Sequence, residues 1–382
     1  MHSKFVRRVR YFSNLKVIAY FFSRFIRKIK ILLPGRFVWK MTSMPKEREK
    51  LKKFSCAPHQ SMPPPGVPLN LKSSLRVILG IPPYVSRSGI LVESDMYFTF
   101  TNSAKECNIN LEEMNLVTSS YRKSNSSNSI DLERILILDG NFPANSAGPI
   151  SHAEIAEIRK QGIKVVVDIP DCYYTSDGGD KIEYWLKCSD LVIIHNSRFQ
   201  NLRSHRVMLW PGFPIAYSPY RSKWAKKRVQ ISFTGTNHRN RSTYRDGAVR
   251  AGIEVPDLMH NRNNPNNSIQ KYSEYLRPLK FSKFAFSNGY LSSVESIIVG
   301  RALESLACGS VLLYEAGSDL NFFFSEYQDF VPILNVPDLI EKVYFLSEND
   351  TLAQTIADNG QKKMLSEFSS SNFWELVLRR LS

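Results

Sequence analysis

Acidic residues and one histidine stand directly after three apolar runs in the first half of the chain. Asp139 follows RILIL, Asp168 follows KVVV, and His195 follows DLVII. Carboxylates and imidazoles can remove a proton from a reacting hydroxyl group, so each is a candidate general base. Asp168 is the first choice, because partial desolvation beside the valines would raise the pKa of its carboxyl group. For Asp168, and also for Asp171, the alternative is a carboxylate that caps the loop before the next helix. For His195, the alternative is a packed histidine that donates to a backbone carbonyl.

Three arginines, Arg239, Arg241 and Arg245, follow the apolar run VQISFTG at 229–235 and stand near the start of the next predicted helix. Cations there oppose the helix dipole by about 0.3–1 kcal/mol each, and a solvated surface tolerates them. If an anion occupies the site, the backbone amides, the dipole and the guanidinium groups all favour its binding. We therefore predict a diphosphate site in which Gly235 allows close approach and Arg239 or Arg241 contacts the phosphates.

A further candidate is Glu304, in a short helix that ends before Gly309 and leads into the apolar run VLLY. Gly309 suits the left-handed cap of a helix, and the apolar run is typical of a buried strand. Upstream, Ser292 and Glu295 have the spacing of a capping box, which predicts that the helix starts there, near an incoming anion. Glu304 would then face a ligand cleft. The alternative is an exposed pair with Arg301, worth about 0.2–0.5 kcal/mol.

The elements that must position these residues alternate between buried strands and helices, in two series. The predicted strands are LRVILGI, ERILILDG, KVVVDIPD, DLVIIHNS and VQISFTG, with helices at 151–161, 180–188 and 241–251. This alternation predicts an α/β fold with two doubly wound, Rossmann-like domains. In open parallel sheets, ligands bind beyond the carboxyl ends of the strands. The residues at those ends are Asp139, Asp168 and His195 in the first series, and Gly235, Asn288, Gly289 and Glu315 in the second.

Most of the net charge lies at the N-terminus. Residues 1–60 carry 16 Lys and Arg against two Glu, which leaves +2 of the total of +16 for the rest of the chain. Apolar residues at helical spacing, with basic residues largely opposite, predict an amphipathic helix that binds anionic lipid; a disordered basic tail is the alternative. Lys16 and Arg24 interrupt the apolar run, so neither a membrane-spanning helix nor a secretory signal is predicted. No nucleic-acid partner is predicted, because such proteins spread basic residues over the folded face.

Composition also indicates the boundaries between the parts. The predicted parts are a basic arm at 1–53, a proline-rich linker at 54–70, a first domain at 71–217 and a second domain at 218–369. Between the domains, Pro211, Pro214 and Pro219 would interrupt any regular element. The five cysteines have no close pair, so they form neither a disulfide framework nor a zinc site, which favours a reducing, cytoplasmic setting.

The stretch LESLACGSVLLYEAGSDL, with the following NFFFSEYQDFVPILNVPDLIEKVYFL, resembles the donor-binding half of GT-B-fold glycosyltransferases of group 1 type. The nearest likeness is to the spore-maturation-protein branch. The resemblance implies two domains that face each other across a cleft, with a last helix at 370–382 that crosses back to the first. It also implies that Glu304 contacts ribose or sugar hydroxyls of a nucleotide sugar. Many relatives carry a first glutamate eight residues earlier, where this chain has Ser296.

The function implied is transfer of a sugar, by a hexosyltransferase-like enzyme, from a nucleotide-diphosphate sugar to a hydroxyl of a glycan, lipid or protein. The chain has no Asp-x-Asp pair, the metal ligand of the other main glycosyltransferase fold, so no metal and no cofactor are predicted. The predicted donor-binding residues are Glu304, Arg301, Gly235, Arg239, Arg241, Asn288, Gly289 and Glu315. With its basic arm, the enzyme would lie in the cytoplasm at the inner face of a membrane. The alternatives are a non-catalytic nucleotide- or glycan-binding protein of this fold, a membrane-surface scaffold driven by the arm, and an exostosin-type enzyme of the secretory pathway.

Overall fold

In the computed structural model, the described part of the chain lies within one compact unit, Pro65–Ser382. The described residues are 75–81, 83–87, 90–113, 134–141, 150–170, 172, 178–202, 204–234, 241–255, 271–289 and 297–382. The predicted basic arm and proline-rich linker therefore lie outside the described residues, as do Asp171, Gly235 and Arg239. No helix within these described ranges combines the length and apolarity needed to cross a membrane.

The first sheet has six strands in the order β4-β1-β5-β6-β7-β8, and every pairing in it is parallel. Its strands are β1 (Arg76–Gly80), β4 (Asn110–Glu113), β5 (Arg134–Asp139), β6 (Lys164–Ile169), β7 (Leu191–Ile194) and β8 (Val207–Leu209). The buried strands carry almost continuous apolar runs, as expected where helices cover both faces of a parallel sheet.

The second sheet has four strands in the order β12-β11-β10-β9, again all parallel. Its strands are β9 (Val229–Ser232), β10 (Ser282–Ser287), β11 (Val311–Glu315) and β12 (Val331–Ile333). Within the described residues, the α-helices are α5 (Asp95–Glu106), α6 (His152–Lys160), α7 (Gly178–Cys188), α8 (Tyr217–Tyr220), α9 (Arg241–Arg250), α10 (Tyr272–Phe281), α11 (Gly300–Ala307), α12 (Val336–Glu348), α13 (Asp350–Glu367) and α14 (Ser370–Leu381). The predicted α/β class with two parallel sheets is confirmed.

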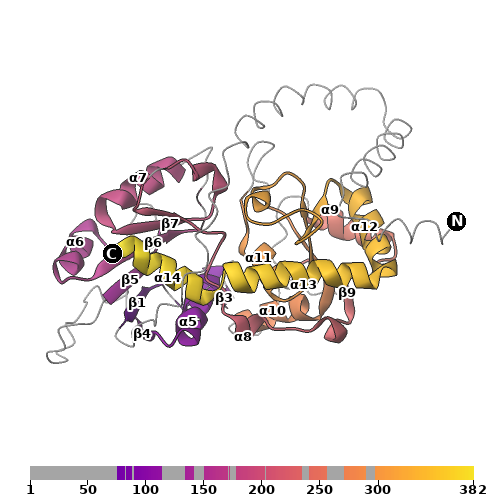
Figure 1. Ribbon diagram of the computed structural model, residues 1–382, viewed down its shortest axis with the longest axis horizontal. Helices are drawn as coiled ribbons and strands as arrows, with labels where there is room; N and C mark the ends of the chain where they lie inside the picture. Colours follow the sequence, from indigo (N-terminus) through magenta and orange to yellow (C-terminus); the bar gives the residue numbers. More distant parts are fainter. Residues whose placement is uncertain are drawn as a thin grey trace, which may run out of the picture. The chain divides into compact units, whose positions relative to one another are not determined.

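We call the first sheet with α5, α6 and α7 the first lobe, and the second sheet with α9 to α13 the second lobe (Figure 1). The last helix, α14, directly follows α13 but contacts α5 and β7 of the first lobe. Trp374 on α14 is fully buried, and its indole nitrogen donates to the Ser103 hydroxyl on α5 at 2.8 Å. A segment far from the first lobe in sequence therefore forms part of it.

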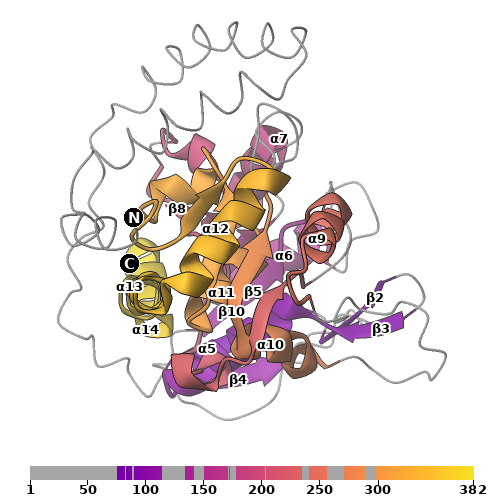
Figure 2. The same cartoon turned by 90° about the vertical axis from the view of Figure 1, so that its right-hand side faces the viewer.

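A hairpin not predicted from the sequence precedes α5. Strands β2 (Tyr84–Arg87) and β3 (Ile90–Glu93) pair antiparallel and form a separate two-stranded ribbon (Figure 2). Directly after it, the Ser94 side chain accepts a hydrogen bond from the Tyr97 amide and so starts α5 with a regular N-terminal cap. The hairpin thus fixes the point at which α5 enters the first lobe.

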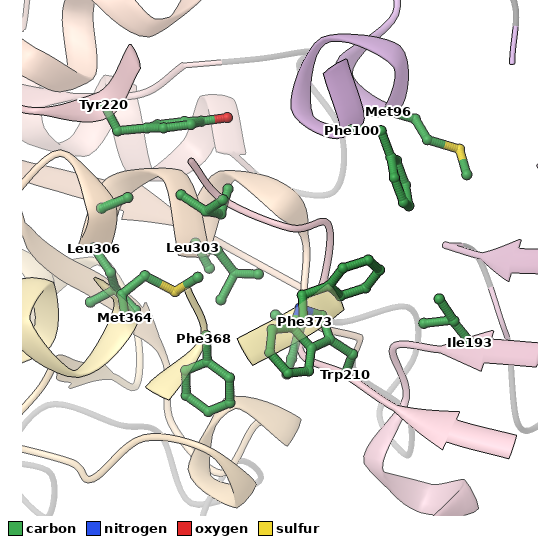
Figure 3. Packing of buried hydrophobic residues seen from close by; sticks show 14 of the residues in the cluster. Met96, Phe100, Ile193, Trp210, Tyr220, Leu303, Leu306, Met364, Phe368 and Phe373 are labelled. Atoms are coloured by element: carbon green, nitrogen blue, oxygen red, sulfur yellow. The ribbon is translucent and has the colours of Figure 1, made fainter. Parts of the chain in front are cut away.

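One hydrophobic cluster contains residues of both lobes (Figure 3). Met96 and Phe100 come from the first lobe and Leu303 from the second. The Trp210 ring lies edge-on to Phe368 at 5.6 Å, and other members of the cluster continue into α14. The two lobes therefore share a core in addition to the separate clusters within each of them.

Two local predictions from the sequence are wrong. Pro219 does not exclude regular structure, because it lies in the first turn of the short helix α8, where a backbone amide needs no helical partner. Helix α11 begins at Gly300 after an extended Val299, whereas the capping-box spacing predicted its start near Ser292. The run Ile297–Val299 consists of β-branched residues, which favour extended backbone. Ser292 and Glu295 themselves lie outside the described residues.

The predicted cap of the same helix is confirmed. Gly309 has φ +64°, the left-handed conformation, and its amide donates to the Leu306 carbonyl at 2.9 Å. This turn directs the chain from α11 into β11, so that Glu304 and Glu315 lie on consecutive elements.

Candidate functional site

The carboxyl edge of the first sheet places the three candidate bases on adjacent strands. Asp139 on β5 is in register with Asp168 on β6, and His195 follows β7 directly. The His195 Nε2 lies 2.5 Å from Asp168 Oδ1, and its Nδ1 lies 2.9 Å from the Trp210 carbonyl oxygen. The structure therefore joins two separately predicted residues into one buried pair, in which His195 is 2% and Asp168 0% exposed.

The hydrogen bonds of this pair determine where its protons are. A carbonyl oxygen only accepts, so Nδ1 of His195 carries a hydrogen and donates to Trp210. Nε2 and the Asp168 carboxyl then share a second hydrogen, because a bare imidazole nitrogen and a carboxylate would repel each other at this distance. The alternative of a packed histidine that donates to a backbone carbonyl is thus what the structure shows.

Asp139 differs from this pair because it is half-buried, and its Oδ1 accepts from the Asn141 amide at 2.9 Å. Of the three candidate bases, Asp139 is the one whose side chain is partly exposed, so an acceptor hydroxyl could contact it. The sequence ranked Asp168 first on desolvation, but complete burial also removes that carboxylate from the path of a substrate.

In the second lobe, Arg241 begins α9 and is only 3% exposed, so the alternative of a solvated arginine is wrong. Its Nη2 donates to Asn288 Oδ1 at 2.8 Å and its Nη1 to the Thr234 carbonyl at 3.4 Å. Burial, and after it the positive charge of the nearby Arg301, lower the pKa of Arg241 to about 9. Two buried or partly buried arginines therefore lie close together at the carboxyl edge of the second sheet.

Arg301 on α11 has two buried guanidinium nitrogens, Nε and Nη1, without a hydrogen-bond partner among the described residues. Four hydroxyl groups in the second lobe also lack a partner among the described residues. Those of Ser232, Thr234 and Ser287 lie at or just after strand ends, and that of Ser318 lies after β11, just before Asp319. Buried polar groups in native proteins normally have partners, so this accumulation is typical of a surface that a polar ligand completes. These hydroxyl groups were not predicted from the sequence, although the strand-end positions of Ser232 and Ser287 were a usable signal.

Glu304 is 4% exposed, which excludes the alternative of an exposed pair on a solvated helix. The Tyr275 hydroxyl donates to its Oε2 at 2.8 Å, and the Tyr272 hydroxyl donates to its Oε1. Burial raises the pKa of Glu304, the two tyrosine hydrogen bonds and the charge of Arg301 lower it, and the net pKa is about 7. The tyrosines were not predicted; their spacing of three residues, on one face of a helix, was the available signal.

The strand ends next to Glu304 are closely packed around Gly289. Its amide donates to Glu315 Oε2 at 2.9 Å, and a Cβ atom there would lie 2.0 Å from the Ile297 carbonyl oxygen. The Tyr314 hydroxyl donates to that same carbonyl at 2.9 Å. Glycine is therefore required at 289 by close approach, and one oxygen of Glu315 supports the backbone.

The two carboxyl edges meet at one cross-lobe contact. The 3-10 helix η2 (Ser197–Phe199) follows β7, and η4 (Asp319–Phe322) follows β11. The Ser197 amide donates to Asp319 Oδ2 at 3.3 Å and joins the two helices. The residues at the ends of the first sheet and those of the second are thus held on facing edges, as ligand binding between two such sheets requires.

Within the described ranges, no group of three or more His, Cys, Asp or Glu side chains is placed to hold a metal ion. The donors at the second edge are arginine nitrogens, hydroxyl groups and amides, a set that suits phosphate and sugar oxygens.

Comparisons with known proteins agree on the architecture. Residues 223–379 match a protein family described as "Glycosyl transferase-like". Among solved structures, an α-glucosyltransferase in complex with UDP-glucose and DNA containing an abasic site is similar, with a TM-score of 0.54 and 13% identity, over 81% of this chain and 99% of that one. The HepE protein of Anabaena in complex with UDP and glucose has a TM-score of 0.50 and 10% identity, over 80% of this chain and 99% of its own. No curated protein matches the sequence.

Proposed function

We propose that this chain, which has the GT-B fold and whose residues 223–379 match a family described as glycosyltransferase-like, is a glycosyltransferase that moves a sugar from a nucleoside-diphosphate sugar to a hydroxyl acceptor without a metal ion. The observation that carries this proposal is the arginine pair at the second edge. Arg241 is buried close to Arg301, and Arg301 keeps two buried nitrogens without a partner among the described residues. A diphosphate would supply both the charge and the acceptors that this arrangement lacks.

The reaction breaks the bond between the anomeric carbon and the diphosphate oxygen, which leaves with the electron pair. The acceptor oxygen forms the new bond to that carbon and loses its proton. Negative charge grows on the leaving diphosphate, so fixed guanidinium groups stabilise the transition state more than the ground state. We assign this task to Arg241 and Arg301, with Arg239 as a further candidate outside the described residues. Glu304 is assigned to the ribose hydroxyls of the nucleotide.

A base is needed if the reaction inverts the configuration of the sugar. The half-buried carboxylate of Asp139 is the group we propose to receive the proton. Asp168 and His195 were also candidates, but Asp168 Oδ1 bonds to His195 Nε2, and His195 Nδ1 bonds to the Trp210 carbonyl. We therefore assign these two residues a supporting role on the strands next to Asp139. If the reaction retains configuration, none of the three needs to act as a base.

A panel of nucleoside diphosphates tests the donor site by thermal shift. We expect at least one of UDP, GDP, ADP and CDP to stabilise the wild-type chain. Arg301→Ala should bind it about 10- to 100-fold more weakly, because one or two charge-assisted hydrogen bonds are lost. Arg250→Ala, an exposed arginine on α9, is the matched control and should bind as the wild type does. Failure of every nucleotide to stabilise the wild type would contradict the donor site.

A non-catalytic binding protein of this fold is the rival function. It would bind the nucleotide through the same arginines, so affinity alone does not separate the two. Slow release of free sugar from a nucleotide sugar without acceptor, lost in Arg301→Ala, is expected of the enzyme only. The DNA seen with the α-glucosyltransferase belongs to that protein; for this chain we propose a glycan, lipid-linked or protein hydroxyl, since residues outside 1–60 carry a net charge of only +2.

We also propose that the basic arm, residues 1–53, attaches the enzyme to anionic lipid in the cytoplasm. Its 16 Lys and Arg within residues 1–60, between apolar residues at helical spacing, support this. In liposome flotation, the full chain should float with vesicles that contain phosphatidylserine and should stay behind with neutral vesicles. A chain that lacks residues 1–60 should not float with either. Equal flotation of the shortened chain would refute the proposal.

A further inference from the structure

Two tyrosines one helical turn apart hold the carboxylate of Glu304 from the same side. Tyr272 and Tyr275 lie in the first turn of α10, with their ring centroids 5.2 Å apart. Tyr272 donates to one carboxylate oxygen and Tyr275 to the other. Each oxygen retains a second lone pair, so the carboxylate can still accept from a ligand.

Gly300 places no side chain beside one of these oxygens. A Cβ atom built on Gly300 would lie 3.5 Å from Glu304 Oε1, an ordinary van der Waals contact. A larger residue at the start of α11 would therefore extend a side chain next to the carboxylate, and glycine does not.

The first lobe fixes the tyrosines in turn. The Tyr272 amide, at the start of α10, donates to Glu93 Oε2 at 2.7 Å, and the Phe98 ring packs against the Tyr272 ring at 4.7 Å. Glu93 ends β3 and Phe98 lies on α5, so both come from the part of the chain that precedes the second lobe. The orientation of Glu304 in one lobe therefore depends on contacts from the other.

We propose that Tyr272 and Tyr275 are positioning residues that keep Glu304 ionised and oriented to accept hydrogen bonds from the vicinal hydroxyls of the donor's ribose. This inference rests on the proposed function. Its physical basis is that a buried carboxylate needs donors to remain charged, and two tyrosine hydroxyls supply them. A protonated Glu304 would have one oxygen that donates, and it would lose one of its two acceptor positions toward the ribose.

Several charged or titratable groups face Glu304, and they act in both directions. On α10 these are Tyr272 and Tyr275; on α11, Arg301 and Cys308; on α5, Asp95; and on α8, Tyr220. Burial raises the pKa of Glu304, whereas the tyrosines and Arg301 lower it and Asp95 raises it. Removal of a tyrosine hydroxyl therefore moves the pKa of Glu304 upward.

The first measurement uses no ligand. The folded pKa of Glu304, about 7, lies above the ordinary value of 4.5. Its contribution to stability is therefore fully present below pH 4.5 and is lost as the pH rises to about 7. The unfolding free energy of the wild type minus that of Glu304→Gln should fall over this window. The same comparison is made in the Tyr275→Phe background. There, the unfolding free energy of Tyr275→Phe minus that of the double variant Tyr275→Phe, Glu304→Gln should keep falling until a pH about half to one unit higher than in the wild type.

The second measurement is UDP affinity, by calorimetry on the full chain between pH 5.5 and 8.5. Wild-type affinity should fall below the titration midpoint of Glu304, and Glu304→Gln should bind weakly with no such midpoint. In Tyr275→Phe and Tyr272→Phe the midpoint should rise, so that binding is about three- to tenfold weaker at pH 6.5 and nearly normal at pH 8.5. Tyr327→Phe, a tyrosine 46% exposed elsewhere on the second lobe, is the control and should match the wild type.

The two measurements distinguish the possible failures. If neither tyrosine variant moves the ligand-free titration, the inference is overturned, whether or not UDP binds. If both variants weaken UDP binding equally at every pH, the tyrosines have only a structural role, and the inference is again overturned. If the pH dependence of unfolding moves as expected in the tyrosine variants but no nucleoside diphosphate binds the wild type, the proposed function is wrong. The effect of the tyrosines on the ionisation of Glu304 would still be confirmed.

Discussion

Replacement of Trp374 by alanine should lower the free energy of unfolding by about 3–5 kcal/mol, the range for loss of a large buried aromatic side chain. Trp374 is fully buried on α14, where its ring lies edge-on to Phe100 at 6.1 Å and to Phe373 at 5.2 Å. The alanine would leave a cavity between α14 and α5 and would remove the donor to the Ser103 hydroxyl. Urea denaturation, followed by circular dichroism, measures the change.

Two further variants show which part of this effect is packing. Trp374→Phe keeps most of the ring and loses the indole nitrogen, so a loss of about 1–2 kcal/mol is expected. Trp224→Ala is the matched control, because that tryptophan also donates a hydrogen bond, to Asp350 at 3.1 Å, but is only partly buried. We expect about 1 kcal/mol or less from it. Equal losses at the two positions would show that α14 does not depend on Trp374 for its attachment.

Replacement of Asp168 by alanine should cost a similar amount, about 3–5 kcal/mol, because it removes the buried carboxyl partner of His195 Nε2. The bond from Nδ1 to the Trp210 carbonyl would remain. The imidazole would lose both the hydrogen bond and the counter-charge that Asp168 supplies. Chemical denaturation at pH 7 measures the loss.

Asp168→Asn is the informative comparison. The asparagine amide can donate to Nε2 of a neutral His195, while Nδ1 still donates to the Trp210 carbonyl, so each ring nitrogen keeps a partner. We expect a loss below about 1.5 kcal/mol. If asparagine were as damaging as alanine, the charge of the pair rather than its hydrogen bonds would hold this edge of the first sheet together.

The sequence was sufficient where the signal is local. Apolar runs, followed by an acidic residue or a histidine, located β5, β6 and β7, because a strand buried on both faces must be apolar throughout its length. Gly309 was identified as a helix cap, since its positive φ is costly for other residues. Local signals failed at the start of α11, where a capping-box spacing competed with the β-branched run before Gly300, and the run determined the backbone.

Local sequence signals predicted the positions of the candidate site residues but not their partners. The positions of Asp168, His195, Arg241 and Glu304 at strand ends and helix ends could be predicted, because the carboxyl edge of a parallel sheet is where ligands bind. Their partners could not be predicted. Asp168 and His195 are 27 residues apart and meet through strand register, and Glu304 meets Tyr272 through the packing of α10 on α11.

The sequence by itself therefore determined which chemical groups this protein presents and on which kind of element, since hydrophobic periodicity and backbone preference act over a few residues. Only the tertiary structure decided which of those groups are buried, which are joined to each other, and which remain without a partner. Those properties depend on contacts between segments far apart in the chain, such as Glu93 with the start of α10. Burial and pairing set the protonation of Glu304 and the accessibility of Asp139, because the free energy of a charge depends on the atoms around it.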